Sequence, residues 1–93
     1  MVMDRLTISA HEIRILDVLR KNKGVWLTSQ EVSAQAKVSD RTARMHLLRF
    51  VKMNIIERTQ TFPGYRYRWK HAAEQTNGEY LRRIAAAQEA MSP

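Results

Sequence analysis

The close spacing of two helix-start signals in the middle of the chain constrains the fold more than any other feature. Thr28 and Glu31 have the pattern of a capping box, in which a hydroxyl and a carboxylate each satisfy a backbone N–H group left unpaired at a helix start. Ser39 is a second N-cap residue that follows shortly after. A helix that starts at Thr28 is therefore short, and Lys37 and Val38 must form the whole turn before a second helix begins.

The second of these helices has one apolar face and one polar face. Ala43, Leu47, Phe50 and Val51 recur at the spacing of a single helical face and predict a helix from residue 40 to about residue 52. Two helices joined by a two-residue turn have the spacing of a helix-turn-helix. On the outer face of the second helix, a helical wheel places Arg41, Met45, Leu48, Arg49 and Lys52.

Capping-box patterns also predict a helix at each end of the chain. Ser9 with Glu12 begins the first helix, Gly24 supplies its C-terminal stop, and residues 25–27 are long enough only for a brief strand. A further pattern at residues 76–79 begins a C-terminal helix after a connector without strong periodicity. That helix carries an apolar stripe, which consists of Tyr80, Leu81, Ile84, Ala87 and Met91. Such a stripe must be covered by another surface.

Before the connector, the sequence predicts a β-hairpin. Residues 55–61 and 65–70 have the composition of two strands, and the turn Phe62-Pro63-Gly64 between them contains two structure breakers. In the second strand aromatic and cationic residues alternate, so one face is aromatic and the other is cationic. The aromatic residues are Tyr65, Tyr67 and Trp69, and the cationic residues are Arg66, Arg68 and Lys70.

The excess positive charge of the chain is concentrated in this central region. The formal net charge is +7, and residues 25–70 carry nine positive and three negative side chains, whereas residues 71–93 carry two and three. A basic region followed by a nearly neutral tail is typical of a protein that binds a polyanion, and phosphates are the first candidate.

The order of these elements resembles the winged helix-turn-helix domains of small transcriptional regulators from bacteria, phages and plasmids. Segments 28–32, 36–47 and 54–58 are similar to the family's second helix, its recognition helix and its first wing strand. The resemblance implies a mainly α fold with a small β-hairpin, in the order α-β-α-α-β-β, followed by a C-terminal helix. It divides the chain into an N-terminal arm (1–8), a DNA-binding domain (9–70) and a connector with the C-terminal helix (71–93).

Two positions depart from the family's pattern. Lys37 stands where many of these domains have glycine, which implies either a positive φ, at a cost of about 1 kcal/mol, or a slightly different turn. The hairpin tip at residues 62–64 has no arginine or lysine. We therefore expect the hairpin to hold phosphates beside the groove rather than to enter the minor groove deeply.

The resemblance places residues 40–52 in the major groove of duplex DNA. Base contacts are expected from Arg41, Arg44 and Met45, because arginine can fork onto guanine and a methionine methyl group can meet a thymine methyl group. Phosphate contacts are expected from hydroxyl groups at the helix start and from cations toward its end, which are Ser39, Thr42, Arg49 and Lys52. The hairpin adds Arg58, Arg66, Arg68 and Lys70.

These residues predict a sequence-specific double-stranded DNA-binding transcriptional regulator, and a repressor in particular. The alternatives are an accessory DNA-binding protein of replication, recombination or plasmid partition, and a winged-helix module whose basic face binds an acidic protein. A homodimer through the C-terminal apolar stripe would pair two recognition helices. Packing of that stripe on the protein's own first helix is the alternative.

Other classes of function find no support in the residues. With no cysteine, and with three histidines far apart, we expect no metal site and no cofactor. We expect His46 to be a packing residue with satisfied hydrogen bonds, and no nucleophile is spaced for catalysis with it, so no enzyme is expected. No apolar run could span a membrane and no secretory signal is found, which predicts a cytoplasmic protein, and no small-molecule ligand is evident.

Overall fold

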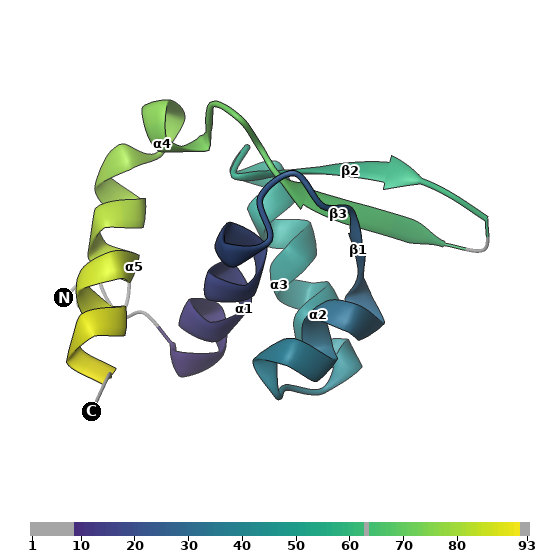
Figure 1. Cartoon of the computed structure of the whole chain (residues 1–93), viewed down its shortest axis with the longest axis horizontal. Coiled ribbons are helices and arrows are strands. Elements are labelled where there is room, and N and C mark those ends of the chain that lie inside the picture. Colours follow the sequence, from purple (N-terminus) through teal and green to yellow (C-terminus); the bar gives the residue numbers. More distant parts are fainter. Residues whose placement is uncertain (1–8, 63, 92–93) are drawn as a thin grey trace, which may run out of the picture.

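A computed structural model of the chain describes residues 9–62 and 64–91 (Figure 1). The N-terminal arm expected at residues 1–8, Pro63 of the hairpin turn and the side chain of Met91 lie outside the described residues. The predicted order of elements is confirmed, with a further short helix near the C-terminus. The elements are α1 (Ala10–Lys21), β1 (Leu27–Thr28), α2 (Ser29–Ala36), α3 (Asp40–Lys52), β2 (Ile56–Gln60), β3 (Tyr65–Trp69), α4 (Ala73–Thr76) and α5 (Gly78–Met91).

Helix α1 begins as predicted but ends earlier. The Glu12 backbone N–H donates to Ser9 Oγ at 3.1 Å, and the Glu12 carboxylate accepts from the Ser9 backbone N–H, so the capping box is confirmed. The helix ends at Lys21, because Asn22 caps it by donating from its backbone and its side chain to the Val18 carbonyl. Gly24, with φ +84°, lies in the turn that follows instead of stopping the helix.

The helix-turn-helix is formed by the local signals that predicted it. Thr28 and Glu31 form the second capping box, and the Ser39 hydroxyl accepts from the Thr42 backbone N–H at 3.0 Å. Lys37 has φ +59°, so the chain takes the left-handed conformation that favours glycine rather than a different turn. The strand before α2 is displaced from residues 25–27 and consists of Leu27 and Thr28.

The three strands form one antiparallel sheet in the order β1-β3-β2. Ile56 lies opposite Trp69 and Leu27 lies opposite Tyr67, so the inner halves of all three strands contribute apolar side chains to one face. The Thr61 backbone N–H donates to the Gly64 carbonyl at 2.6 Å and closes the hairpin. The hairpin extends away from the helices at the end of the molecule opposite α5 (Figure 1).

The core lies between α1, α3 and the inner face of the sheet. Leu16, Leu19, Leu47, Phe50 and Ile56 are at most 1% exposed. Each such side chain stabilises the fold by roughly 1.5–3 kcal/mol relative to an exposed position, which is enough to override the modest helix propensities of the flanking residues. Helix α3 is thereby held with one face inward and the other open to solvent.

The C-terminal region differs from the prediction in its helix boundaries. The expected connector at residues 71–76 contains the one-turn helix α4. The Thr76 hydroxyl donates to the Ala72 and Ala73 carbonyls and belongs to that turn, so it does not begin the following helix as a cap. Instead, Asn77 separates the two helices, and its side-chain amide donates at 2.7 Å to the carbonyl of Met53 at the end of α3.

The apolar stripe of α5 is covered within the chain. Leu81 and Ile84 are 3% and 2% exposed, and the partly buried Tyr80 and Ala87 pack against the same core. Helix α5 lies beside α1 (Figure 1). The alternative, packing of the stripe on α1, accounts for the buried Leu81 and Ile84, and a homodimer through the C-terminal stripe stays a prediction. Among the described residues, no helix is long and apolar enough to cross a membrane.

Candidate nucleic-acid interface

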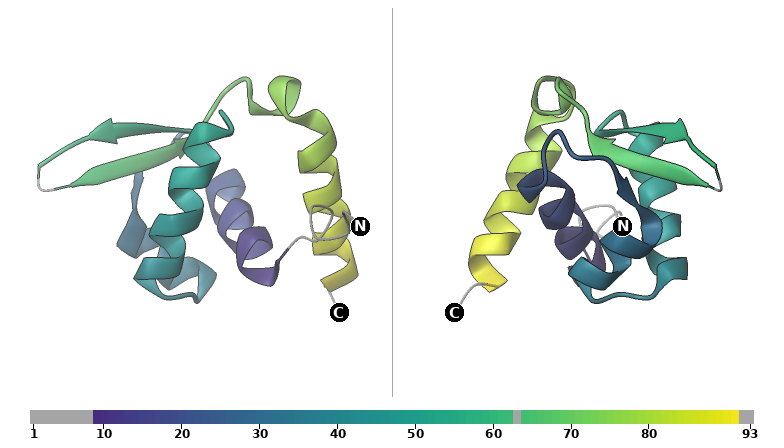
Figure 2. Two further views of the ribbon diagram at one scale, coloured as in Figure 1. Left: turned by 180° about the vertical axis from the view of Figure 1, so that it is seen from behind. Right: turned by 45° about the vertical axis from the view of Figure 1, so that its right-hand side comes forward.

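Helix α3 presents an uninterrupted exposed stripe to solvent. Seen from behind, α3 lies in front of the other two helices of the domain (Figure 2). The stripe consists of Arg41, Met45, Leu48 and Lys52, of which Met45 is 62% and Leu48 42% exposed. Two large apolar side chains between two cations are costly to leave in water, and both fit contact with thymine methyl groups in a major groove.

A groove of about 340 Å³ lies beside this stripe, between the start of α3, the start of α2 and the hairpin. Arg44 enters its lining from α3 and Arg66 from β3. Gln30 and Asp40 line the same groove. The fold thus brings together two of the predicted arginines from elements that are distant in sequence.

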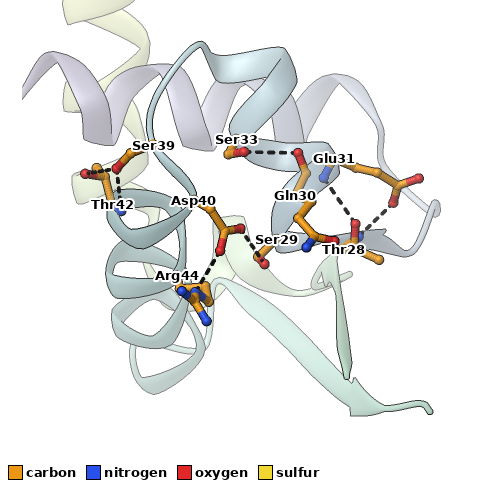
Figure 3. Close-up of polar contacts among 9 residues, drawn as sticks. All are labelled: Thr28, Ser29, Gln30, Glu31, Ser33, Ser39, Asp40, Thr42 and Arg44. Carbon is orange, nitrogen blue, oxygen red and sulfur yellow. Dashed lines mark hydrogen bonds and ion pairs between the residues drawn. The ribbon is translucent and has the colours of Figure 1, made fainter. Parts of the chain in front are cut away.

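Arg44 is held in a defined position by a residue that sequence reasoning missed. Its Nε lies 3.0 Å from Asp40 Oδ2, and Asp40 Oδ1 accepts a hydrogen bond of 3.0 Å from the Ser29 hydroxyl (Figure 3). The spacing of four residues between Asp40 and Arg44 is the signal that could have found this pair, because such residues are neighbours on a helix surface. Ser29 could not have been found this way, since it belongs to α2.

Ser39 and Thr42 are engaged with each other at the start of α3. Besides accepting from the Thr42 backbone, the Ser39 hydroxyl lies 2.9 Å from the Thr42 hydroxyl (Figure 3). Ser39 is exposed and Thr42 is half-buried. The cap explains Ser39 structurally, and contact of either hydroxyl with phosphate stays a prediction.

The cationic face of the hairpin is partly neutralised. Arg68 donates to one carboxylate oxygen of Glu57 at 2.9 and 2.7 Å and stacks on Trp26, with its guanidinium carbon 4.2 Å from the ring centroid. Lys70 donates to the Asn54 side chain at 3.4 Å. Arg66 is exposed and has no carboxylate partner among residues 9–62 and 64–91. Of the three predicted cations on this face, Arg66 is therefore the most available.

Arg58 does not extend this face. It lies opposite Tyr67, and residues directly opposite each other in an antiparallel pair point to the same side of the sheet. Its guanidinium stacks on Tyr65 at 4.3 Å from the ring centroid. The strand register thus places Arg58 on the aromatic face, opposite to the side that carries Arg66 and Arg68.

No family model and no curated protein sequence matches this chain. Solved structures do match. A MarR-family transcriptional regulator from Silicibacter pomeroyi aligns with a TM-score of 0.69 and 18% identity over 96% of this chain and 60% of its own. The YusO protein from Bacillus subtilis aligns with a TM-score of 0.64 and 16% identity, over 95% and 63%. A MarR family protein from Bacillus stearothermophilus gives 0.57 and 19%, over 91% and 62%.

These alignments cover nearly the whole helix and strand order of this chain. The fold is a winged helix-turn-helix. The chain spans less than two thirds of the length of each of these structures. In winged helix-turn-helix terms, α2 and α3 are the two helices of the motif, α3 is the recognition helix, and the β2–β3 hairpin is the wing.

Arg49 joins the recognition helix to α1, although half of its side chain stays exposed. Its Nη2 lies 3.2 Å from Glu12 Oε2, and the Glu12 side chain is only 4% exposed. The Tyr80 hydroxyl of α5 donates to the same carboxylate oxygen. Burial, and then its hydrogen bond to Glu12, raise the pKa of Tyr80 well above its ordinary value, so this hydroxyl stays protonated and keeps donating. The predicted contact of Arg49 with phosphate would have to compete with this ion pair.

His46 is a half-buried packing residue at the edge of the core, without the satisfied hydrogen bonds that were expected. Its ring stacks on Phe50 with centroids 6.0 Å apart. Its buried Nδ1 has no partner within the described part of the chain. Burial is the main cause that lowers the pKa of His46 below its ordinary value of 6.5, and the nearby Glu12 carboxylate opposes this effect.

We expect His46 to make the protein less stable in acid. Because the pKa is lower in the folded than in the unfolded chain, the unfolded chain takes up the proton first as the pH falls below about 6.5. The free energy of unfolding should therefore fall between pH 7 and pH 5, measured by urea titration at each pH. His46→Gln should flatten this dependence, whereas the same change at the exposed His71 should leave it in place. An equal pH slope in wild type and His46→Gln would contradict the assignment.

Proposed function

We propose that this protein is a sequence-specific double-stranded DNA-binding transcriptional regulator and that it acts as a repressor. The observation that carries the proposal is the exposed stripe of α3 beside a groove that Arg44 and Arg66 line from the recognition helix and the wing. A recognition helix of this kind fits the major groove of B-form DNA, while the wing meets the adjacent backbone. The structural neighbour that is named a transcriptional regulator supports the proposal.

The base-reading residues in this proposal are Arg41, Arg44 and Met45, together with Leu48. The arginines offer donors to guanine, and the two apolar side chains meet thymine methyl groups. Leu48 is added because it is exposed on the same stripe, between Met45 and Lys52.

The phosphate contacts fall on side chains whose charge or hydroxyl group is accessible. We assign them to Lys52, Arg66 and Lys70, with Ser39 and Thr42 at the N-terminus of α3. Arg58 would contribute from the other face of the wing, beside Tyr65. Arg49 and Arg68 take lesser parts, because each already neutralises a carboxylate within the chain.

Repression would follow from occupancy of the site alone. A protein bound over a promoter excludes other proteins from the same stretch of duplex, and this needs neither an enzyme activity nor a cofactor. A homodimer is part of the proposal, because it predicts the symmetry of the DNA site. Two recognition helices about 34 Å apart would select an inverted repeat.

A salt titration with random duplex DNA tests the proposal, followed by selection of bound duplexes from a random pool. With about five phosphate contacts, the slope of log affinity against log salt should be about −4 to −5. Selection should return a common motif, with dyad symmetry if two copies bind. The absence of measurable duplex binding at low salt would refute the proposal, and a basic face that binds an acidic protein would then become the better explanation.

A further inference from the structure

Asp40 is the acidic residue in the lining of the groove that Arg44 and Arg66 also line. A carboxylate there repels DNA phosphates and so carries a cost in any duplex complex. Its place in the first turn of α3 favours helix formation, but that benefit needs neither of the side-chain contacts that it makes. Helix formation therefore does not explain why the Asp40 carboxylate contacts Ser29 and Arg44.

Both carboxylate oxygens of Asp40 are occupied, by two different helices. Oδ1 accepts from the Ser29 hydroxyl of α2 at 3.0 Å, and Oδ2 pairs with Arg44 Nε of α3 at 3.0 Å (Figure 3). The hydroxyl orients the carboxylate by a hydrogen bond, and the carboxylate holds the guanidinium by an ion pair. The arginine is thus oriented from a second element rather than by a flexible surface pair alone.

The pair leaves the reading end of Arg44 accessible. The ion pair with Asp40 is made through Nε, and the side chain of Arg44, which lines the groove, remains 63% exposed. The two terminal nitrogens of a guanidinium can donate together to O6 and N7 of guanine. An arginine that is already oriented loses less conformational freedom when it binds, so its interaction is stronger and more selective.

We infer that Asp40 is a positioning residue that orients Arg44 for guanine, which rests on the proposed DNA-binding function. Asp40 itself need not touch the DNA. Ser29 completes the arrangement as the residue that orients Asp40. Recognition of one guanine per recognition helix then depends on three side chains, of which Arg44 alone contacts the base.

The experiment replaces guanines in the duplex selected by the wild-type protein with 7-deazaguanine, one at a time, which removes the N7 acceptor. Wild type should lose about tenfold in affinity at one position, because one of the two acceptors of a bidentate arginine contact is removed. Arg44→Ala should abolish that discrimination. Asp40→Asn should reduce it to less than about threefold and should add nothing in combination with Arg44→Ala. Ser29→Ala should reduce it partially, and gives a second test if Asp40→Asn folds poorly.

Asp17→Asn is the matched control, because Asp17 forms an ion pair of the same length with Lys21, four residues later, on α1. It should leave the discrimination unchanged, and a thermal melt of each variant shows that it is folded. If wild type selects a guanine that Arg44 reads but folded Asp40→Asn and Ser29→Ala read it equally well, the inference is wrong and the proposed function stands. The inference is also wrong if Arg44→Ala changes no guanine dependence. Absence of duplex binding by the wild-type protein would overturn both.

Discussion

Replacement of Arg49 by leucine is expected to lower the free energy of unfolding by about 2–3 kcal/mol. Arg49 is the cation that compensates Glu12, whose carboxylate is almost fully buried at the junction of α1, α3 and α5. Without Arg49, the Glu12 carboxylate would keep the Tyr80 hydroxyl and the Ser9 backbone N–H as its donors among the described residues. A buried carboxylate that loses its ionic partner costs much more than a broken surface pair. Urea unfolding followed by tryptophan fluorescence measures the loss.

A double-mutant cycle separates this charge effect from lost packing. In a Glu12→Gln background the same Arg49→Leu change should cost less than about 1 kcal/mol, because no charge is then left unpaired. Arg41→Leu is the control on the same helix, and at an exposed position it should stay within about 0.5 kcal/mol of wild type. Equal costs of Arg49→Leu in both backgrounds would show that Glu12 does not depend on Arg49.

The largest effect on duplex binding among single wing residues is expected at Arg66. Arg66→Gln should weaken binding to every duplex by about tenfold near physiological salt and reduce the salt slope by about 1, because one phosphate contact is lost. Arg66 lines the groove beside Arg44 and is exposed. Fluorescence anisotropy with labelled random duplexes at several salt concentrations measures both quantities.

The Arg68–Glu57 pair is the matched comparison, since Arg68 lies two residues away on the same face of β3. Removal of both charges together, with Arg68→Gln and Glu57→Gln, keeps the net charge and should leave the salt slope unchanged. The ion pair neutralises Arg68 within the protein at 2.7 Å, so little counterion release is expected from it. A slope that falls as far as in Arg66→Gln would mean that Arg68 leaves Glu57 to contact phosphate.

Most of the fold and part of the site could be predicted from the sequence, for reasons visible in single residues. The starts of α1, α2 and α3 were predicted because an N-cap hydroxyl satisfies a backbone N–H only three residues away. The outer face of α3 was predicted because helical periodicity fixes which residues share a side, and Arg41, Met45 and Lys52 are exposed there. Asp40 was missed although its partner is only four residues away.

The sequence by itself thus determined the capped helices, the two-residue turn and the amphipathic recognition helix, because each depends on interactions within a few residues. Only the tertiary structure decided that Arg49 pairs with Glu12, that strand register places Arg58 with the aromatic residues, and that the stripe of α5 is covered by α1. Each of these contacts forms between segments that are far apart in the chain. Local periodicity does not specify which buried charge or apolar face a segment will contact in the folded protein. Which cations of a basic surface remain available to a phosphate is therefore a property of the packed fold.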